Sequence, residues 1–345
     1  MSNFYTESPL WHEKIGDIHA LLERVKINEE RFREQNGDVL RLRKLSRIMS
    51  IHASTAIEGN RLSLSQVSDV INGVPVWGPP KDVKEVQNAW QAYNGLDSYD
   101  PWSADDLLGA HSLMTSELIG ESGTFRSVDV AVMRSDGIVI HRGANPASVP
   151  CLVAELFDWG RESPAHPLIK SSAVHFMLEH IHPFRDGNGR IGRLWQTLIL
   201  SKWNPLFAWM PIETLVHYNQ ALYYKALQDS HSNGVDCRPF IDCMLDMIEN
   251  SMYKYIDVAT ETAYDSDGYV NEPVNEPVKM ILVLMRRYPQ ITYDELAERA
   301  GKSRSTVLRI VRQLKEQQRI VRVGSDKNGH WEVFDEKQEI SQARQ

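Results

Sequence analysis

His182-Pro-Phe-Arg-Asp-Gly-Asn-Gly-Arg-Ile-Gly-Arg193 is the stretch of this sequence that decides its fold. It lies between two apolar helical patterns, over residues 168–180 and 194–203. Pro183 and the run Asp186-Gly-Asn-Gly189 predict a tight loop that opens the second helix. The first N–H groups of a helix have no partner within the helix and carry the positive end of its dipole. The loop is therefore predicted to bind an anion.

The charged side chains of this stretch add chemistry to the anion site. Arg190 and Arg193 are three residues apart, so they share a helix face and can hold further phosphates through their planar donor groups. Asp186 offers the oxygen ligand that Mg²⁺ prefers between protein and phosphates. His182 titrates near neutrality when unperturbed, so it can take a proton from an attacking hydroxyl. A base, a metal ligand and an anion site thus occur within one short stretch.

The spacing of these residues resembles the signature of the Fic family, HPFxDGNGRxxR, at every defined position. Members of that family are helical enzymes, most of which transfer AMP from ATP to a Ser, Thr or Tyr hydroxyl of a protein. The resemblance implies a mainly α fold, a Fic-fold helical bundle with a β-hairpin flap. It also implies ATP as substrate, Mg²⁺ as cofactor, a protein target that can include the chain itself, and a homodimer.

The resemblance assigns roles to individual residues. His182 is the general base for the target hydroxyl, and Asp186 is the Mg²⁺ ligand. Tyr224 is preferred over Tyr223 as the ring against the adenine, although tyrosines on a helix face are usually core residues. The implied ATP-binding set is Glu58, His182, Gly187, Asn188, Gly189, Arg190, Ile191, Gly192, Arg193 and Tyr224.

A second resemblance lies at Ser54-Thr-Ala-Ile-Glu-Gly-Asn60, which is similar to the family's inhibitory motif [ST]xxxE[GN]. It implies that Glu58 pairs with Arg193 and prevents productive binding of the γ-phosphate, with Ser54 as part of the same motif. Glycine and asparagine are typical residues after a helix end, so the sequence predicts an inhibitory helix over about residues 40–60. The alternative is a solvated glutamate at a helix end.

Residues 128–141 show the one clear strand-like alternation, with Val128, Val130 and Val132 before an Asp136-Gly137 turn. From the residues alone, the predicted hairpin is either a surface connection or a functional flap. The family resemblance favours a flap that captures the target segment by strand addition. The docking residues are then Val130, Ala131, Val132 and Ile138.

The net charge of −8, from 38 Lys+Arg and 46 Asp+Glu, hides an asymmetry. Residues 278–333 carry +6, whereas the first 277 residues carry −13. Between them NEPV occurs twice in tandem, which predicts an extended linker because each proline disfavours helix in its predecessor. The predicted domains are an N-terminal helical region (1–100), a Fic core (101–256, with the motif at 182–193), a linker (257–277) and a basic domain (278–345).

The basic end resembles a winged helix-turn-helix over residues 291–333. Two helices are expected, over residues 293–300 and 303–317, followed by a wing over residues 320–333. The residues expected to contact DNA are Arg304 and Ser305 at base edges and Arg309 and Arg312 at phosphates. The alternative is a winged helix that makes only protein contacts or packs in place.

Other function classes stay open or are excluded. Removal of AMP, or transfer of another nucleotide group, is the alternative within enzymes, and a DNA-binding regulator with the Fic body as sensor is the alternative outside them.

The longest apolar run is residues 280–285 and the N-terminus lacks a signal-peptide pattern, so we expect no membrane span. Three cysteines without CxxC spacing predict buried free thiols and a cytoplasmic protein. His175, His180 and His182 are packing residues or a metal cluster, and no cysteine or further histidine supports the metal.

Overall fold

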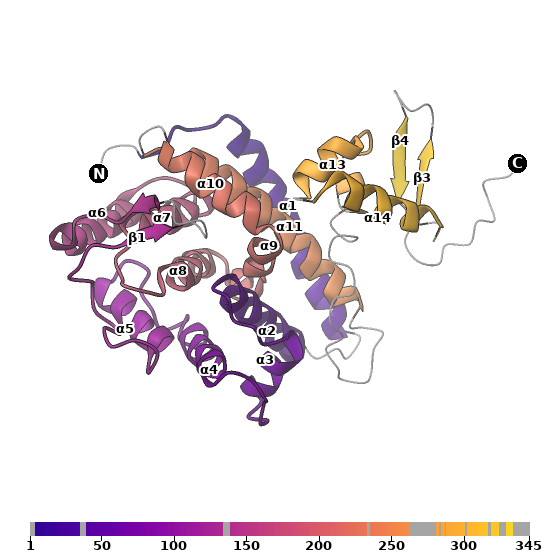
Figure 1. Ribbon diagram of the computed structural model, residues 1–345. Helices are drawn as coiled ribbons and strands as arrows, with labels where there is room; N and C mark the ends of the chain where they lie inside the picture. Colours follow the sequence, from indigo (N-terminus) through magenta and orange to yellow (C-terminus); the bar gives the residue numbers. More distant parts are fainter. Residues whose placement is uncertain are drawn as a thin grey trace, which may run out of the picture. The chain divides into compact units, whose positions relative to one another are not determined.

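The computed structural model describes residues 4–34, 39–133, 139–232, 235–261, 281–282, 284–286, 288–300, 302–316, 319–323 and 329–333. The chain forms two compact units, residues 1–270 and 271–345 (Figure 1). Among the described residues no helix is both long and apolar enough to cross a membrane.

The larger unit is built almost entirely of helices, with one short hairpin. Its elements are α1 (Leu10–Glu34), α2 (Val39–Ile57), α3 (Leu64–Ile71), α4 (Pro80–Asn94), α5 (Ala104–Thr115), β1 (Ala131–Met133), β2 (Val139–Arg142), η1 (Pro146–Ser148), α6 (Val149–Glu162), α7 (Pro167–Ile181), α8 (Asn188–Trp203), η2 (Pro205–Trp209), α9 (Ile212–Tyr218), α10 (Gln220–Ser232) and α11 (Arg238–Glu261).

Helices α7 and α8 form the centre of this unit and pack against each other. Both are buried on nearly all sides, and α7 accordingly lacks the one-sided apolar stripe of a surface helix. Figure 1 shows α8 surrounded by other helices of the bundle. The motif loop at 182–187 joins the two central helices, so its position is fixed at both ends.

Helix α2 ends beside this centre. Its buried Arg47 donates to the carbonyl oxygen of Ala208 at 2.9 Å and lies over the Trp209 ring, which fixes α2 against η2. The helix ends at Ile57, and Gly59 follows with a φ of +92°, a conformation that favours glycine. The end of α2 therefore falls where the sequence predicted it, with Glu58 in the turn.

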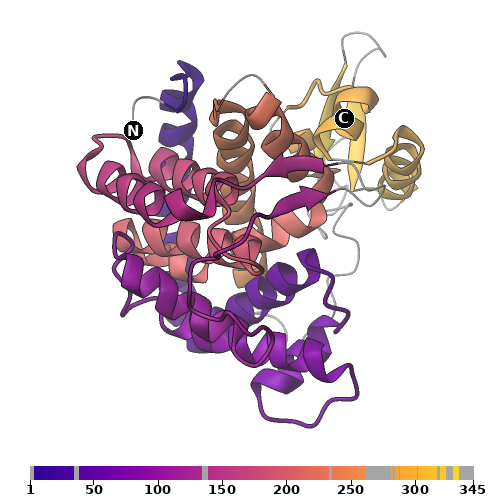
Figure 2. The same cartoon turned by 60° about the vertical axis from the view of Figure 1, so that its left-hand side comes forward.

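The predicted hairpin forms an antiparallel pair, with Ala131 opposite Arg142 and Val132 opposite His141 (Figure 2). The register shifts after Val132, so the ladder is short. The predicted turn at Asp136-Gly137 and the docking residue Ile138 lie outside the described residues.

The smaller unit contains α13 (Tyr293–Arg299), α14 (Arg304–Glu316), β3 (Ile320–Val323) and β4 (His330–Val333), preceded by helical residues among 281–286. Strands β3 and β4 pair antiparallel as a wing. Trp331 is buried in the core of this unit and donates from Nε1 to the carbonyl oxygen of Ile291 at 3.0 Å. The predicted fold class, a helical bundle with a hairpin plus a winged helix, is confirmed.

Two details differ from the sequence analysis. Helix α11 continues to Glu261, so its last turn occupies the first residues of the predicted linker, and most of that linker lies outside the described residues. All three cysteines are free, but Cys151 is exposed, because it lies on the outer face of α6, whereas Cys237 is buried. The expectation of buried thiols was therefore wrong for Cys151.

Candidate active site

The motif loop is shaped by two residues in left-handed conformations. His182 ends α7 with a φ of +53°, and Gly187 precedes α8 with a φ of +86°. The buried His111 of α5 stacks on the Phe184 ring at 3.7 Å and contacts the carbonyl oxygen of Asp186 through Nε2 at 2.9 Å. Nδ1 of His111 accepts from the Gly123 N–H, so Nε2 carries the proton and donates. The loop is thus held from α5 as well as from its ends.

Asn188 closes the loop from inside. Its side chain accepts from the Phe184 N–H at 2.9 Å and donates to the Phe184 carbonyl oxygen at 2.8 Å. The side chain is buried and fully engaged in these two bonds. The predicted phosphate contact of Asn188 is therefore left to its backbone N–H.

Replacing Asn188 by alanine is expected to lower the free energy of unfolding by about 1–3 kcal/mol, because two buried backbone groups of Phe184 lose their partner. Chemical denaturation measures this change. Asn72→Ala is the matched control: its side chain also makes two hydrogen bonds, with Lys44 and Ser68, but it is exposed. The control is expected to change stability by less than about 0.5 kcal/mol. An equal effect of both variants would contradict the role of the Asn188 side chain in holding the loop.

His182 has one ring nitrogen engaged and one available. Nδ1 lies 3.3 Å from the carbonyl oxygen of Glu179, which can only accept, so the proton is on Nδ1 and Nε2 has the free lone pair. Burial lowers the pKa of His182 to about 4, with the nearby charges of His141 and Arg126 acting in the same direction. The imidazole is therefore neutral at neutral pH and can accept a proton.

The predicted anion site lies at the start of α8. Hydrogen bonding within the helix begins with the Ile191 N–H, which donates to the Gly187 carbonyl oxygen at 3.0 Å. The preceding N–H groups of Asn188, Gly189 and Arg190 are those that a helix leaves without an internal partner. A Cβ on Gly189 would lie 2.5 Å from Glu58 Oε1, so the absence of a side chain lets a carboxylate oxygen approach the first turn.

Glu58 reaches this turn from the end of α2. Its Oε1 accepts from Arg193 Nη2 at 2.7 Å, and Arg193 also donates to the Ser54 hydroxyl at 3.1 Å and to the Ser54 carbonyl oxygen at 3.0 Å. Arg193 is buried, whereas the Glu58 side chain is 30% exposed. Two residues of the predicted inhibitory motif therefore occupy the donors of the second motif arginine.

Glu179 of α7 is a site residue that the sequence analysis missed. Its Oε1 would lie 3.4 Å from a Cβ on Gly189, beside Glu58 and Arg193. Burial raises the pKa of Glu179 to about 7; Arg193 opposes this rise and the charge of Glu58 adds to it. Glu179 is therefore partly protonated near neutral pH, beside the turn that Glu58 also reaches.

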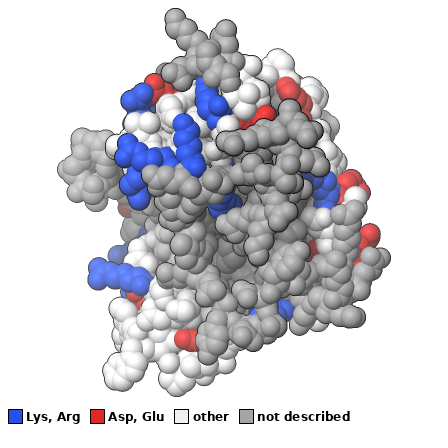
Figure 3. Space-filling model, turned by 90° about the vertical axis from the view of Figure 1, so that its right-hand side faces the viewer, with Lys and Arg blue, Asp and Glu red and all other residues white. Residues whose placement is uncertain are grey.

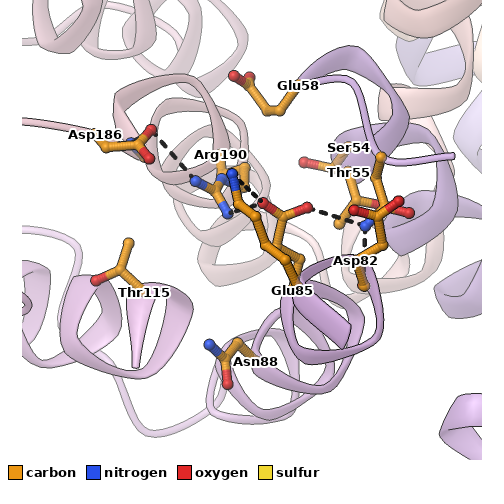
Figure 4. Close-up of polar contacts among 12 residues, drawn as sticks. Ser54, Thr55, Glu58, Asp82, Glu85, Asn88, Thr115, Asp186 and Arg190 are labelled. Atoms are coloured by element: carbon orange, nitrogen blue, oxygen red, sulfur yellow. Dashed lines mark hydrogen bonds and ion pairs between the residues drawn. The ribbon is translucent and has the colours of Figure 1, made fainter. Parts of the chain in front are cut away.

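Arg190 lies between two carboxylates, as Figure 4 shows. Its Nη2 is 3.4 Å from Asp186 Oδ1, and its Nη1 is 3.7 Å from Glu85 Oε1 on α4. Glu85 is buried and also accepts from the side chain of Asn60 at 3.0 Å. Arg190 and Arg193 start from one helix face, as predicted, but contact different partners.

Asp186 is placed to serve as an oxygen ligand. Its side chain is half exposed at the loop, and Oδ1 accepts from the Gly187 N–H at 2.6 Å. A carboxylate beside a helix N-terminus fits Mg²⁺ held between protein and phosphates. Arg190, which contacts the same oxygen, would have to share it with the ion.

The hairpin is tied to the motif loop through Arg126, another residue that the sequence analysis did not find. Arg126 is buried and donates from Nε to the His182 carbonyl oxygen at 2.7 Å and from Nη1 to the Val128 carbonyl oxygen at 2.7 Å. The Gly143 N–H donates to the carbonyl oxygen of Val130, which closes the base of the hairpin. Arg126 therefore ties the hairpin segment to the backbone of His182, and Ala131 on the first strand is exposed.

The two tyrosines of α10 lie in different surroundings. Tyr223 is buried and its hydroxyl is 3.1 Å from His175 Nε2, so it is a core residue. Tyr224 is 49% exposed and contacts the Tyr223 ring edge-on. Of the two, Tyr224 is the ring that a ligand can reach.

The residues predicted for DNA lie on an amphipathic helix. Helix α14 buries Val307, Ile310, Val311 and Leu314 in the core of the smaller unit. Its exposed side carries Arg304, Ser305, Arg309 and Arg312. Arg304 is paired with Asp294 at 2.6 Å, although both side chains are exposed. In Figure 3 several Lys and Arg side chains lie together near the top of the view.

The missed residues share one property: each lies outside the motif and reaches it only in the folded chain. Glu85, His111 and Arg126 follow no spacing pattern in the sequence that would mark them. Glu179 offered a weak signal, as an acidic residue in an otherwise apolar helical segment that ends at the motif.

A helical bundle with a glycine-containing loop between its two central helices, followed by a winged helix, is the arrangement to compare with known proteins. Residues 101–200 match the Fic/DOC family, and residues 275–321 match a family described as winged helix-turn-helix DNA-binding. The crystal structure of a Fic family protein from Desulfovibrio desulfuricans G20 is 33% identical, with a TM-score of 0.70 over 98% of this chain and 100% of that chain. The chain belongs to the Fic family.

Curated relatives carry a functional name. Protein adenylyltransferase Fic of Aedes aegypti is 26% identical over 259 residues, which is 72% of this chain and 49% of the mosquito protein. Protein adenylyltransferase fic-1 of Caenorhabditis elegans is 28% identical over 247 residues, 65% of this chain and 44% of the nematode protein. The chain thus spans about half the length of the curated relatives it matches.

Proposed function

We propose that this protein transfers AMP from ATP to a Ser, Thr or Tyr hydroxyl of a protein. The targets include hydroxyls of its own chain. The observation that carries the proposal is His182, which starts the loop that opens α8 and whose Nε2 keeps a free lone pair while Nδ1 is engaged by the Glu179 carbonyl oxygen. The names of the Aedes and Caenorhabditis relatives support the same activity.

In the proposed reaction the hydroxyl oxygen of the target attacks the α-phosphorus of ATP. The bond from that phosphorus to the bridging oxygen of pyrophosphate breaks, and the hydroxyl proton passes to His182 Nε2. The N–H groups of the first turn of α8 hold the α-phosphate, and Arg190 and Arg193 hold the outer phosphates. Mg²⁺, held at Asp186, would neutralise phosphate charge. Charge in such transfers collects on phosphate oxygens, so fixed positive groups supply most of the catalysis.

Glu58 is proposed to restrain this reaction. Its carboxylate oxygen lies beside Gly189, at the turn that would receive phosphate, and it pairs with Arg193 at 2.7 Å. A phosphate at this position would meet a like charge and would find Arg193 already occupied. The contact is built into one chain, because α2 and α8 belong to the same polypeptide.

Transfer of radiolabel from α-labelled ATP to protein tests the activity. Label on protein from α-labelled ATP supports AMP transfer. Label that appears on protein only when the ATP is labelled at its β- or γ-phosphate indicates transfer of another group. Loss of label from a previously modified protein, without added pyrophosphate, would indicate removal of AMP as the favoured direction.

A second function, DNA binding, is favoured by a separate observation. The winged helix-turn-helix match covers residues 275–321, and four side chains on the exposed face of α14 are Arg304, Arg309, Arg312 and Lys315. Side chains at the start of such a helix meet base edges, and those farther along meet phosphates.

Replacing Arg304 by alanine is expected to weaken specific DNA binding by about 1–3 kcal/mol, the range for a base contact. Fluorescence anisotropy with duplexes selected from a random pool measures the affinity. Arg161→Ala is the matched control, since Arg161 is also exposed and pairs with an aspartate, Asp158, at 2.8 Å. Affinity should fall steeply with salt. An unchanged affinity in the Arg304 variant would refute this assignment.

A further inference from the structure

Three histidines from separate elements meet near the base of the hairpin. They are His141 on β2, His180 on α7 and His231 on α10, and one ring nitrogen of each lies within 4.8 Å of the others. The sequence analysis considered His180 with His175 and His182 and found no further histidine. The fold brings two further histidines to His180, namely His141 and His231. His175 lies elsewhere, with its Nδ1 2.6 Å from Gln196 Oε1.

The spacing of this cluster suits a metal ion. His180 Nδ1 and His231 Nδ1 are 3.2 Å apart. Two nitrogens on a tetrahedral zinc ion with bonds of about 2.0–2.1 Å lie at about this separation. Imidazole is a ligand for Zn²⁺, Cu²⁺, Ni²⁺ and Co²⁺, whereas Mg²⁺ prefers oxygen, so the site differs in chemistry from the one at Asp186. Three histidine ligands leave one position of a tetrahedral ion open.

The hydrogen-bond geometry of the cluster prepares it for such an ion. His141 Nε2 lies 2.6 Å from the carbonyl oxygen of His180, so Nε2 carries the proton and Nδ1 is the ligand nitrogen. Metal-bound histidines are usually oriented in this way by a backbone carbonyl. The Nδ1 atoms of His180 and His231 face each other across 3.2 Å, so both are placed to act as ligand nitrogens.

One adjustment is needed. The rings of His141 and His231 are stacked, with centroids 4.2 Å apart and planes 7° from parallel. Ring lone pairs lie in the ring plane, so these two rings must turn about their side-chain bonds to face one ion. Both side chains are partly exposed rather than locked in the core, which leaves room for that rotation.

The geometry points to a zinc-type site formed by His141, His180 and His231, which takes a divalent ion that prefers nitrogen ligands. The ion would join β2 of the hairpin to the ends of α7 and α10. His180 is two residues before His182, so an ion here would hold the hairpin against the segment that carries the proposed base. This inference does not depend on which nucleotide the protein uses.

Isothermal titration of the untagged, metal-stripped full chain with Zn²⁺, in excess Mg²⁺, tests the site. We expect one Zn²⁺ per chain, and an affinity at least about tenfold lower in His231→Ala and His141→Ala, since even loss of an outer partner costs about 10- to 100-fold. His166→Ala is the matched control, because His166 Nε2 lies 3.3 Å from His19 Nε2 in a histidine pair elsewhere. That variant should bind as the wild type does.

A ligand exchange keeps the test decisive if an alanine variant fails to fold. His231→Cys should bind Co²⁺ with the intense thiolate-to-metal absorption that the wild type lacks, because cysteine would replace a ligand. Absence of Zn²⁺ binding by the wild type would overturn the inference. So would equal affinity in His231→Ala, or a folded His231→Cys that shows no thiolate absorption.

Discussion

Replacing His182 by alanine should reduce AMP transfer by about 10²–10⁴-fold, the usual contribution of a general base. The variant is best made in the Glu58→Gly background, where a fast reference rate is expected. The loss is expected because Nε2 of His182 has the free lone pair that can accept the hydroxyl proton, while Nδ1 is engaged by the Glu179 carbonyl oxygen. Initial rates of labelling from α-labelled ATP measure the loss. Labelling that persists without His182 would refute its role.

The pH profile separates this role from a structural one. Burial lowers the pKa of His182 to about 4, so the base stays neutral as the solution is acidified. From about pH 7.5 to about pH 5.5 we expect kcat/KM of the Glu58→Gly protein to show no decline centred on the ordinary histidine pKa of about 6.5. Protonation of Glu179, whose pKa burial raises to about 7, acts in the opposite direction in this range, because it removes negative charge from the turn that would receive phosphate. A decline centred near the ordinary value would contradict the lowered pKa.

Replacing Glu58 by glycine should raise AMP transfer by about 10- to 100-fold, because a hydrogen bond between charged groups contributes about 1.5–3 kcal/mol. The change frees Arg193 for phosphate and removes a carboxylate oxygen from the turn at Gly189. Ser54 continues to accept from Arg193, so the buried guanidinium keeps two hydrogen bonds. The measurement is the initial rate of labelling at a fixed ATP concentration.

Glu117→Gly is the matched control for this prediction. Glu117 is also ion-paired and in a turn, 2.6 Å from Lys84, and its positive φ of 60° tolerates glycine. It lies on the exposed surface and has no contact with Arg193. An equal rise in both variants, or no rise in Glu58→Gly, would contradict restraint by Glu58.

The sequence allowed more of the site to be predicted than of its surroundings. The loop, its helix start and the end of α2 follow from local signals, namely proline, glycine and helical periodicity. The surroundings come from tertiary packing: Glu85 reaches Arg190 from another helix, and His111 stacks on Phe184 from a third. No spacing rule connects residues so far apart, and a single sequence carries no covariation.

Two features of the site were not predicted. Asn188 is expected at a phosphate, which is left to its backbone N–H; the side chain bonds the backbone of Phe184 only four residues away, because a tight loop needs its own buried groups satisfied. The histidine cluster was missed for the opposite reason. His141 and His231 are far from His180 in sequence and meet it only when the hairpin and α10 pack against α7.

Mass spectrometry of intact protein incubated with ATP and Mg²⁺ tests the central claim most directly. The comparison is between the wild type, Glu58→Gly and the Glu58→Gly, His182→Ala double variant. The account predicts a mass gain of one AMP that is strongest in Glu58→Gly, weak in the wild type and absent from the double variant. Equal gain in the wild type and Glu58→Gly, or gain in the double variant, would contradict it.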